Sequence, residues 1–461
     1  MRPSRLAVLV LAFAVLAWGC APGERSLPTG PDGPSLAKQS CDLGATDAEL
    51  SALIGQLIAR VEALAASGAL NAGQANALRA HLEGVRQAIL EGKYCSARAK
   101  LNAFLEQVEN FVGEGALSED EADLLTDEVT TLLDGELVQE RYPTWSPDGQ
   151  RILFYRVTEV AGARRVDLVV VNADGSGETM LAQNEPALFN RPTWSPDGTR
   201  IALVPAESFF RERVHIVNAD GTGRVNISGD HRDQYPAWSP DGNRIALSRY
   251  VGEEFFPGVG GSASVLHVMN TDGSGATRLT TPQTNIHVDA DFSWSPDGSS
   301  IRFGIWNTWF DKSAFPHTIQ VIDADGSNQV LLGDGDASRW SSNGNVVAFV
   351  HQSALWVMQH DGGGRASLTD PSVGDYPSWA PDGSSIAFAR TPTPFGTYQV
   401  FRIAPDGTNE TNLSNSPLSH RGPQWSPDGT RIAFERLLPG GSRHIYVMNA
   451  DGSGQTRLIN P

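Results

Sequence analysis

The segment that begins near residue 46 carries apolar residues at helical spacing. Between Thr46 and Gly68 one apolar stripe recurs every three or four residues: Leu50, Leu53, Ile54, Leu57, Ile58, Val61 and Leu64. Thr46 with Glu49 forms a capping box, and Gly68 suits the left-handed end of a helix. Similar patterns predict three more helices, over 71–91, 96–112 and 118–133.

The helical segment is duplicated at an offset of 47 residues, and Ser118 with Glu121 repeats the capping box. Val61-Glu62 matches Val108-Glu109, 68–70 matches 115–117, and Ala75 and Leu78 match Ala122 and Leu125. Two similar helical hairpins are therefore expected to pack into one four-helix unit.

From residue 141 to the end, the pattern changes to short apolar runs between Gly-rich and Pro-rich turns. The phrase Trp-Ser-Pro-Asp-Gly, with two variants, stands at 145–149, 194–198, 238–242, 294–298, 340–344, 379–383 and 425–429. Each copy precedes a β-branched and aromatic run, and a second turn phrase such as Asn-Ala-Asp-Gly (172–175) follows later. These seven copies are numbered repeats 1 to 7 in chain order.

Both phrases are turn chemistry, because Pro fixes φ and Gly accepts the left-handed conformation that ends a turn. Each repeat therefore holds four antiparallel strands, A to D, with tight turns joining A to B and C to D. Four short strands at a period of 40 to 50 residues predict a β-propeller. We expect seven blades, each A-strand Trp packed between neighbouring sheets. Residues 136–139 either pair at the closing blade or are not needed for closure.

The paired phrases Trp-Ser-Pro-Asp-Gly and Ile-Tyr-Val-Met-Asn-Ala-Asp-Gly (445–452) resemble the repeats of TolB-like propellers, also called WD-like periplasmic repeats. Residues 94–133 resemble the small helical FIMAH modules of secreted bacterial proteins. The resemblances imply an all-β propeller of seven four-stranded blades with a small N-terminal all-α helical hairpin domain. TolB itself has an α/β domain and six blades, which argues against a role in the Tol-Pal system. The FIMAH-like module is expected to be a spacer or docking module.

The first twenty residues have the pattern of a signal peptide. Arg2 and Arg5 precede an apolar run, 6–18, that is too short to span a bilayer. The run ends at Gly19-Cys20, which resembles a lipobox and implies lipidation of Cys20; the alternative is an ordinary secreted protein with a stray Cys. If Cys20 carries lipid, Cys41 and Cys95 are free to form a disulfide. The expected organisation is 1–20 signal peptide, 21–40 flexible tether, 41–135 helical module and 136–461 propeller.

The charge of the chain excludes some classes of partner. The 461 residues carry a formal net charge of -18, and nucleic acid or anionic lipid is bound through clustered Lys and Arg. We therefore expect no nucleic-acid partner, and contact with a membrane only through the lipid anchor. Asp in the Asp-Gly turns accounts for part of the acidity.

Alternating strand direction places residues just before the A strands around the channel mouth, on the face that carries the variable B–C loops. Polar residues gather there, either because channel mouths are wet or because they bind a peptide or sugar. The candidate mouth residues are Arg141, Tyr142, Asn190, Arg191, Gln234, Tyr235, Asp291, Asp336, Asp375, Tyr376 and Arg421.

Aromatic residues in the B–C loops of three successive repeats form a second candidate site. They either merge into an exposed binding patch or fold inward as local cores. They are Phe209, Phe210, Phe255, Phe256, Trp306, Trp309 and Phe310.

Catalytic signatures are missing from the sequence: it holds no Gly-x-Ser-x-Gly, no His-Glu-x-x-His and no Cys-x-x-Cys. His231, His287 and His420 precede A strands and are either solvated loop histidines or, by resemblance to oligogalacturonate lyases, ligands of a metal. We expect no catalytic residue and no cofactor. The preferred hypothesis is a non-catalytic binding or scaffolding lipoprotein of the bacterial cell envelope that recognises an envelope protein or glycan. The alternative is a metal-dependent polysaccharide lyase or hydrolase.

Overall fold

The computed structural model describes most of the chain beyond residue 42, and all of it belongs to one compact unit, 42–461. The described residues are 43, 45–134, 136–160, 163–185, 190–205, 212–252, 263–282, 286–288, 292–307, 317–374, 377–393 and 396–459. The predicted signal peptide, the tether, Cys20 and Cys41 lie outside them.

The first part of the described chain consists of four helices, as the apolar stripes predict. They are α1 (Asp47–Ser67), α2 (Ala72–Leu90), α3 (Tyr94–Gly113) and α4 (Glu119–Asp134). The predicted capping boxes are present, with Glu49 N donating to Thr46 Oγ1 and Glu121 N to Ser118 Oγ, both 3.3 Å. Gly68 ends α1 at φ 85°. Among the described helices, α1 is long and apolar enough to cross a membrane by composition. Its buried residues, however, join the core shared by all four helices.

Each repeat folds into antiparallel strands. Repeats 1 to 3 comprise β1 (Glu136–Trp145), β2 (Arg151–Val160), β3 (Ala163–Asn172), β4 (Thr179–Glu185), β5 (Thr193–Trp194), β6 (Arg200–Leu203), β7 (His215–Asn218), β8 (Val225–Asn226), β9 (Asp233–Trp238), β10 (Arg244–Val251), β11 (Ala263–Asn270) and β12 (Thr277–Arg278).

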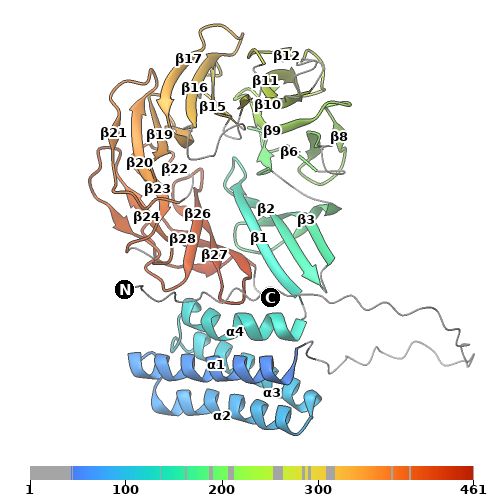
Figure 1. Cartoon of the computed structure of the whole chain (residues 1–461), viewed down its shortest axis with the longest axis vertical. Helices are drawn as coiled ribbons and strands as arrows, with labels where there is room; N and C mark the ends of the chain where they lie inside the picture. The colour runs from blue at the N-terminus through green and yellow to red at the C-terminus, as the bar shows by residue number, and fades with distance from the viewer. Residues whose placement is uncertain are drawn as a thin grey trace, which may run out of the picture. The chain divides into compact units, whose positions relative to one another are not determined.

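Repeat 4 has a split A strand and comprises β13 (Ile286–Val288), β14 (Ser293–Trp294), β15 (Ser300–Asn307), β16 (Thr318–Asp323) and β17 (Val330–Asp334). Repeats 5 to 7 comprise β18 (Asp336–Trp340), β19 (Val346–His351), β20 (Ala354–Gln359), β21 (Ala366–Ser367), β22 (Ser378–Trp379), β23 (Ile386–Arg390), β24 (Gln399–Ile403), β25 (Thr411–Asn412), β26 (Ser419–Trp425), β27 (Arg431–Leu437), β28 (Arg443–Asn449) and β29 (Thr456–Arg457). The fold is propeller-like, with sheets of successive repeats side by side around a common centre (Figure 1).

The repeated phrases form the predicted turns. In repeat 1, Gly149 N donates to Ser146 O at 2.8 Å and Gly149 has φ 69°. Asp148 accepts from Ser146 Oγ and from Gln150 N, which lowers the pKa of its carboxyl group. The turn carboxylates are therefore occupied with structural hydrogen bonds.

The tryptophans link each repeat to the one before it. Six of the seven donate an indole N–H to the carbonyl of the residue that precedes the previous repeat's Trp, at 3.0 to 3.3 Å. We call the contact region between two neighbouring repeats a seam. At four seams an arginine adds a contact, because its guanidinium lies over the Trp of the next repeat at 4.7 to 4.9 Å from the ring centre. These arginines are Arg151, Arg200, Arg244 and Arg431.

Repeat 7 contacts repeat 1 in the same way, although their sequences lie at opposite ends of the propeller. Trp145 Nε1 donates to Gln424 O at 3.1 Å, and one cluster of buried apolar residues contains members of both repeats. Strand β1 pairs with β2 along its length and with β28 at Gln139–Arg443. Residues 136–139 therefore extend the first sheet and also touch the last one.

The B–C connection of repeat 5 is a tight turn. Strands β19 and β20 are joined by only two residues, Gln352-Ser353. Both residues have positive φ, 50° and 59°, which suits a tight hairpin whose twist matches its strands.

Candidate binding site at the start of the A strands

The predicted mouth positions coincide with a repeated distortion of the backbone. Four repeats place a residue in the left-handed region three positions before the Trp: Tyr142 (φ 60°), Tyr235 (57°), Ala337 (51°) and Gly422 (59°). The pairing of A with B shifts register at the same place in these repeats. A bulge of this kind re-aims side chains, and a bulky residue at positive φ is strained. Strain retained at two tyrosines marks the position as a candidate site.

Two predicted mouth residues, Tyr142 of repeat 1 and Arg191 of repeat 2, contact each other, and Tyr142 also contacts repeat 7. Tyr142 N donates to Glu435 Oε1 at 2.7 Å, and Arg443 Nη1 donates to Glu435 Oε2 at 2.6 Å. The guanidinium carbon of Arg191 lies 5.8 Å from the centre of the Tyr142 ring. Only Tyr142 and Arg191 among these residues belong to the predicted mouth, whereas Glu435 and Arg443 were not predicted.

Other described mouth residues contact side chains outside the predicted set. Arg421 lies over the ring of Tyr398 at 3.9 Å, and exposed Asp336 accepts from Ala337 N and pairs with His317. Gln234 is half-buried on β9, and Arg141 donates to Gln139. Asp291, Asp375 and Tyr376 lie outside the described residues, so the complete predicted ring stays a prediction.

Two buried polar groups near the mouth of repeats 1 and 2 have no hydrogen-bond partner among the described residues. Asn190 is 4% exposed, and neither its Oδ1 nor its Nδ2 is bonded. The Tyr155 hydroxyl is also unbonded, and burial raises its pKa. Tyr155 packs in the same apolar cluster as Tyr142. An unsatisfied buried amide is costly, and function at such a position is one explanation.

A charged cluster that the sequence did not single out lies beside these residues. Glu140 is 2% exposed, accepts from Ile445 N at 3.1 Å, and pairs with His444 and Arg156. Burial acts to raise the pKa of Glu140, but the hydrogen bond from His444 and nearby positive charges outweigh it and lower that pKa. The sequence position of Glu140 could have pointed to this cluster, because Glu140 directly precedes the predicted mouth residue Arg141.

The three candidate histidines do not converge among the described residues. His231 is exposed, His287 is half-buried, and the described part of the chain has no group of three His, Cys, Asp or Glu side chains fit for a metal. The interpretation of all three as solvated loop histidines is wrong for His420, which is fully buried. Its Nε2 accepts from Arg436 Nε at 3.0 Å, and burial with the Arg436 charge lowers the His420 pKa to about 2. A guanidinium in this position repels a cation, so His420 is unsuited to metal binding.

The aromatic loop patch cannot be placed. Phe209, Phe210, Phe255, Phe256, Trp309 and Phe310 lie outside the described residues, and Trp306 is placed only as part of β15. Cys95 is exposed at the second position of α3, and its predicted partner Cys41 is not described. The patch and the disulfide stay predictions.

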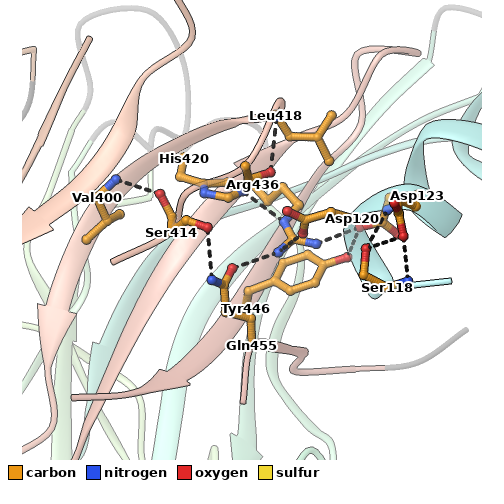
Figure 2. A network of polar contacts seen from close by, with 12 residues as sticks. Ser118, Asp120, Asp123, Val400, Ser414, Leu418, His420, Arg436, Tyr446 and Gln455 are labelled. Carbon is orange, nitrogen blue, oxygen red and sulfur yellow. Dashed lines mark hydrogen bonds and ion pairs between the residues drawn. The ribbon is translucent and has the colours of Figure 1, made fainter. Parts of the chain in front are cut away.

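Arg436 is a buried charge with several bonded partners, and the sequence analysis did not single it out. Its guanidinium is fully buried and binds Asp123 at 2.9 Å and Asp120 at 2.5 Å, both on α4. It also lies 3.6 Å from the centre of the Tyr446 ring and donates to Gln455 Oε1 at 3.2 Å. Figure 2 shows these groups facing one another, from the last repeat on one side and from α4 on the other. The cluster joins two structural modules.

Comparisons with solved structures show the same fold in proteins of different activity. The oligogalacturonate lyase of Vibrio parahaemolyticus is 12% identical with a TM-score of 0.53, covering 68% of this chain and 90% of that one. A Mycobacterium tuberculosis puromycin-hydrolyzing peptidase is 13% identical with a TM-score of 0.56, covering 70% and 53%. The propeller domain of the Pyrococcus furiosus Trilobed protease, described as having an open velcro topology, is 10% identical with a TM-score of 0.51, covering 70% and 98%.

At these identities the likeness concerns the fold, and the neighbours include peptidases and a lyase, so it leaves the activity open. The comparison with curated proteins gives no match. Among protein families, the FIMAH domain matches residues 54–134, and the TolB beta propeller domain matches 155–416 and 305–460, which is more than half of the chain. The chain belongs to the family of proteins with a TolB β-propeller domain.

Proposed function

We propose that this protein is a non-catalytic binding or scaffolding lipoprotein of the cell envelope, which recognises a protein or glycan at the mouth of a seven-bladed propeller. The observation that carries the binding site is the strained backbone at Tyr142 and Tyr235. Two bulky residues are kept at positive φ in equivalent positions of repeats 1 and 3, where glycine would cost less.

Seven blades are supported by the repeated Trp contacts. The indole bond from Trp145 to repeat 7 has the same form as the bonds between consecutive repeats. A ring in which repeat 7 is followed by repeat 1 accounts for this contact. A map with six blades and one repeat outside the ring would contradict it.

Recognition of a protein or glycan fits the chemistry of the described mouth residues. Tyr142 offers an aromatic face beside the guanidinium of Arg191. Aromatic faces with a few fixed polar groups suit sugars and peptide side chains, whereas the charge of -18 disfavours nucleic acid. Anchoring through lipidated Cys20 would hold this surface at the envelope.

The lyase or hydrolase alternative has less support. It needs a His-bound divalent metal, and His420 is held by Arg436 in a buried site. The fold likeness to an oligogalacturonate lyase does not carry activity at 12% identity.

The test uses the lipid-free chain in capture from envelope extract and on a glycan array. Tyr142→Asn and Tyr235→Asn remove the rings while Asn tolerates the left-handed backbone. We expect these variants to lose the bound species. Because each ring also packs partly against an apolar cluster, the melting temperature is measured for each variant and capture is compared where all the proteins are folded. The matched control is Val330→Asn on an outer strand, where the side chain is 46% exposed. Capture that is equal in all four proteins would overturn the mouth as the binding site.

A further inference from the structure

Helix α4 has two opposite faces with different partners. Ala122, Leu125, Val129 and Leu133 are buried in the helical core. Residues two positions earlier, at the same spacing, are polar and contact the last repeat: Asp120, Asp123, Asp127 and Thr131. A shift of two residues corresponds to about 200° around a helix. One helix therefore packs against its own module with one side and against the propeller with the other.

The polar face of α4 contacts β27, β28 and the loop between them. Besides the two ion pairs of Arg436, Gly440 N donates to Asp127 Oδ2 at 2.8 Å, and Thr131 Oγ1 lies 3.3 Å from Ser442 Oγ. A Cβ at Gly440 would come within 2.6 Å of Asp127 Oδ2, so the loop approaches the helix closely. The contacts extend over about three turns of α4.

The internal duplication provides a comparison within the chain. The positions of α2 that correspond to the polar face of α4, 47 residues earlier, are Gly73, Asn76, Ala80 and Gly84. The apolar face is kept in both copies, since Ala75 and Leu78 match Ala122 and Leu125. The acidic face thus occurs only in the copy that contacts the propeller, so duplication of the hairpin does not explain it.

Helix α4 is also connected through the chain to repeat 1, the first repeat of the propeller. Helix α4 ends at Asp134 and β1, the first strand of repeat 1, begins at Glu136. Strand β1 has a single backbone pair with β28 of repeat 7, Gln139–Arg443. We propose that the helical module is the clasp of the propeller: α4, tethered to repeat 1, docks on the β27–β28 hairpin of repeat 7 and holds the ring closed.

The ion pairs and hydrogen bonds around Arg436 suit this role because they connect α4 to residues of repeats 6 and 7. Tyr446 donates its hydroxyl to Asp123 and supports the guanidinium with its ring. Gln455 accepts from Arg436 and donates to Ser414 O of repeat 6 at 3.1 Å (Figure 2). The proposal of a clasp rests on the seven-repeat ring proposed above. Its expected effect is on the stability of β1 and β28, which does not depend on the ligand that the protein binds.

The experiment measures amide hydrogen exchange along the full chain. Arg436→Met removes the charge and leaves a side chain of similar length. Exchange in β1 and β28 should rise about a hundredfold, because a broken buried ion pair leaves uncompensated charge. Exchange in β10, β11 and β16 should stay unchanged. The matched control is Arg200→Met, which should raise exchange at the seam between repeats 2 and 3 only.

A second variant separates the clasp from general loss of stability. Thr131→Cys with Ser442→Cys, added to Arg436→Met, replaces the lost contacts with a covalent link between α4 and the hairpin. Oxidation should restore slow exchange in β1 and β28, and reduction should abolish the restoration. Equal loss of protection in every repeat, no change in β1 and β28, or failure of the oxidised link to restore protection would each overturn the clasp. Loss of the binding function alone would leave this result unaffected.

Discussion

The seam between repeats 7 and 1 differs from the seam between repeats 4 and 5 in what holds it together. Between repeats 4 and 5 the chain itself continues, since β17 ends at Asp334 and β18 begins at Asp336. The Trp340 indole donates to Ser293 O at 3.3 Å, and the position of the stacking arginine is taken by Ser300. Trp340 is only half-buried.

Between repeats 7 and 1 no direct chain connection exists, and the side chains make more contacts. Trp145 is 6% exposed, and Arg431 lies over it at 4.9 Å while donating to Gly149 O and Ala173 O. Glu435 accepts from Tyr142 N across the same seam. The seam between repeats 7 and 1 therefore has the arginine contact that also joins repeats 1 to 4, and the seam between repeats 4 and 5 lacks it.

The largest expected difference concerns the two tryptophans. Trp145→Ala removes a buried ring and should lower the free energy of unfolding by about 3–5 kcal/mol. Trp340→Ala removes a half-buried ring whose sheets stay joined by the chain, so its cost should be clearly smaller. Chemical denaturation of both variants measures the difference. A larger loss for Trp340→Ala would contradict the comparison.

A pH-dependent loss of stability should come from His420 in repeat 7. Its pKa is lowered to about 2 by burial and by Arg436, whereas the unfolded chain takes up the proton near 6.5. The stability that His420 contributes is therefore present above pH 6.5 and is lost as the pH falls, by about 2 kcal/mol at pH 5.

His420→Gln should remove this part of the acid sensitivity, because a Gln carbonyl accepts from Arg436 without titrating. Burial raises the pKa values of Asp120 and Asp127, which acts in the opposite direction and is common to both proteins. Denaturation at pH 5 and pH 7.5 gives the difference. Parallel losses in both proteins would show that His420 does not titrate as described.

The elements of the fold followed from local patterns. Helix spacing with its capping residues gave the four helices, and the turn phrases gave the strands, because both depend on residues near in sequence. The seams were harder to predict. Arg431 looks like any polar residue beginning a strand, and its partners Gly149 and Ala173 lie more than 250 positions away.

The candidate site was predictable only as a set of positions. Counting back from each Trp led to Tyr142 and Tyr235, because the repeat places them at equivalent positions of repeats 1 and 3. Their positive φ was not predictable, because Tyr rarely adopts it and the register shift that imposes it arises between strands. Arg436 and its acids were missed because an acidic helix face usually indicates contact with solvent.

Replacing the arginine at a seam should have a moderate effect on the free energy of unfolding. Arg431→Met keeps the apolar stem and should cost about 1–2 kcal/mol through the lost carbonyl bonds and ring contact. Ser300→Arg would place the same residue over Trp340 and should add about 0.5–1 kcal/mol. Thermal denaturation of the two single variants and their combination tests whether the seams are equivalent. Destabilisation by Ser300→Arg would show that the space beside Trp340 does not accept the side chain.

The smallest expected effect comes from exchanging the residues at the left-handed position. Gly422 in repeat 7 and Ala337 in repeat 5 have φ 59° and 51°. A Cβ at Gly422 would meet Glu435 at 3.8 Å, an ordinary contact, so Gly422→Ala should cost about 1 kcal/mol from backbone strain alone. Ala337→Gly relieves similar strain and loses one buried methyl group of about 0.8 kcal/mol, so it should be nearly neutral. Because the space at Gly422 is open, a cost well above 2 kcal/mol would mean that Ala disturbs Glu435 and its bond from Tyr142. Hydrogen exchange of the Tyr142 amide would then rise in Gly422→Ala and stay unchanged in Ala337→Gly, which separates strain from loss of the contact between repeats 7 and 1.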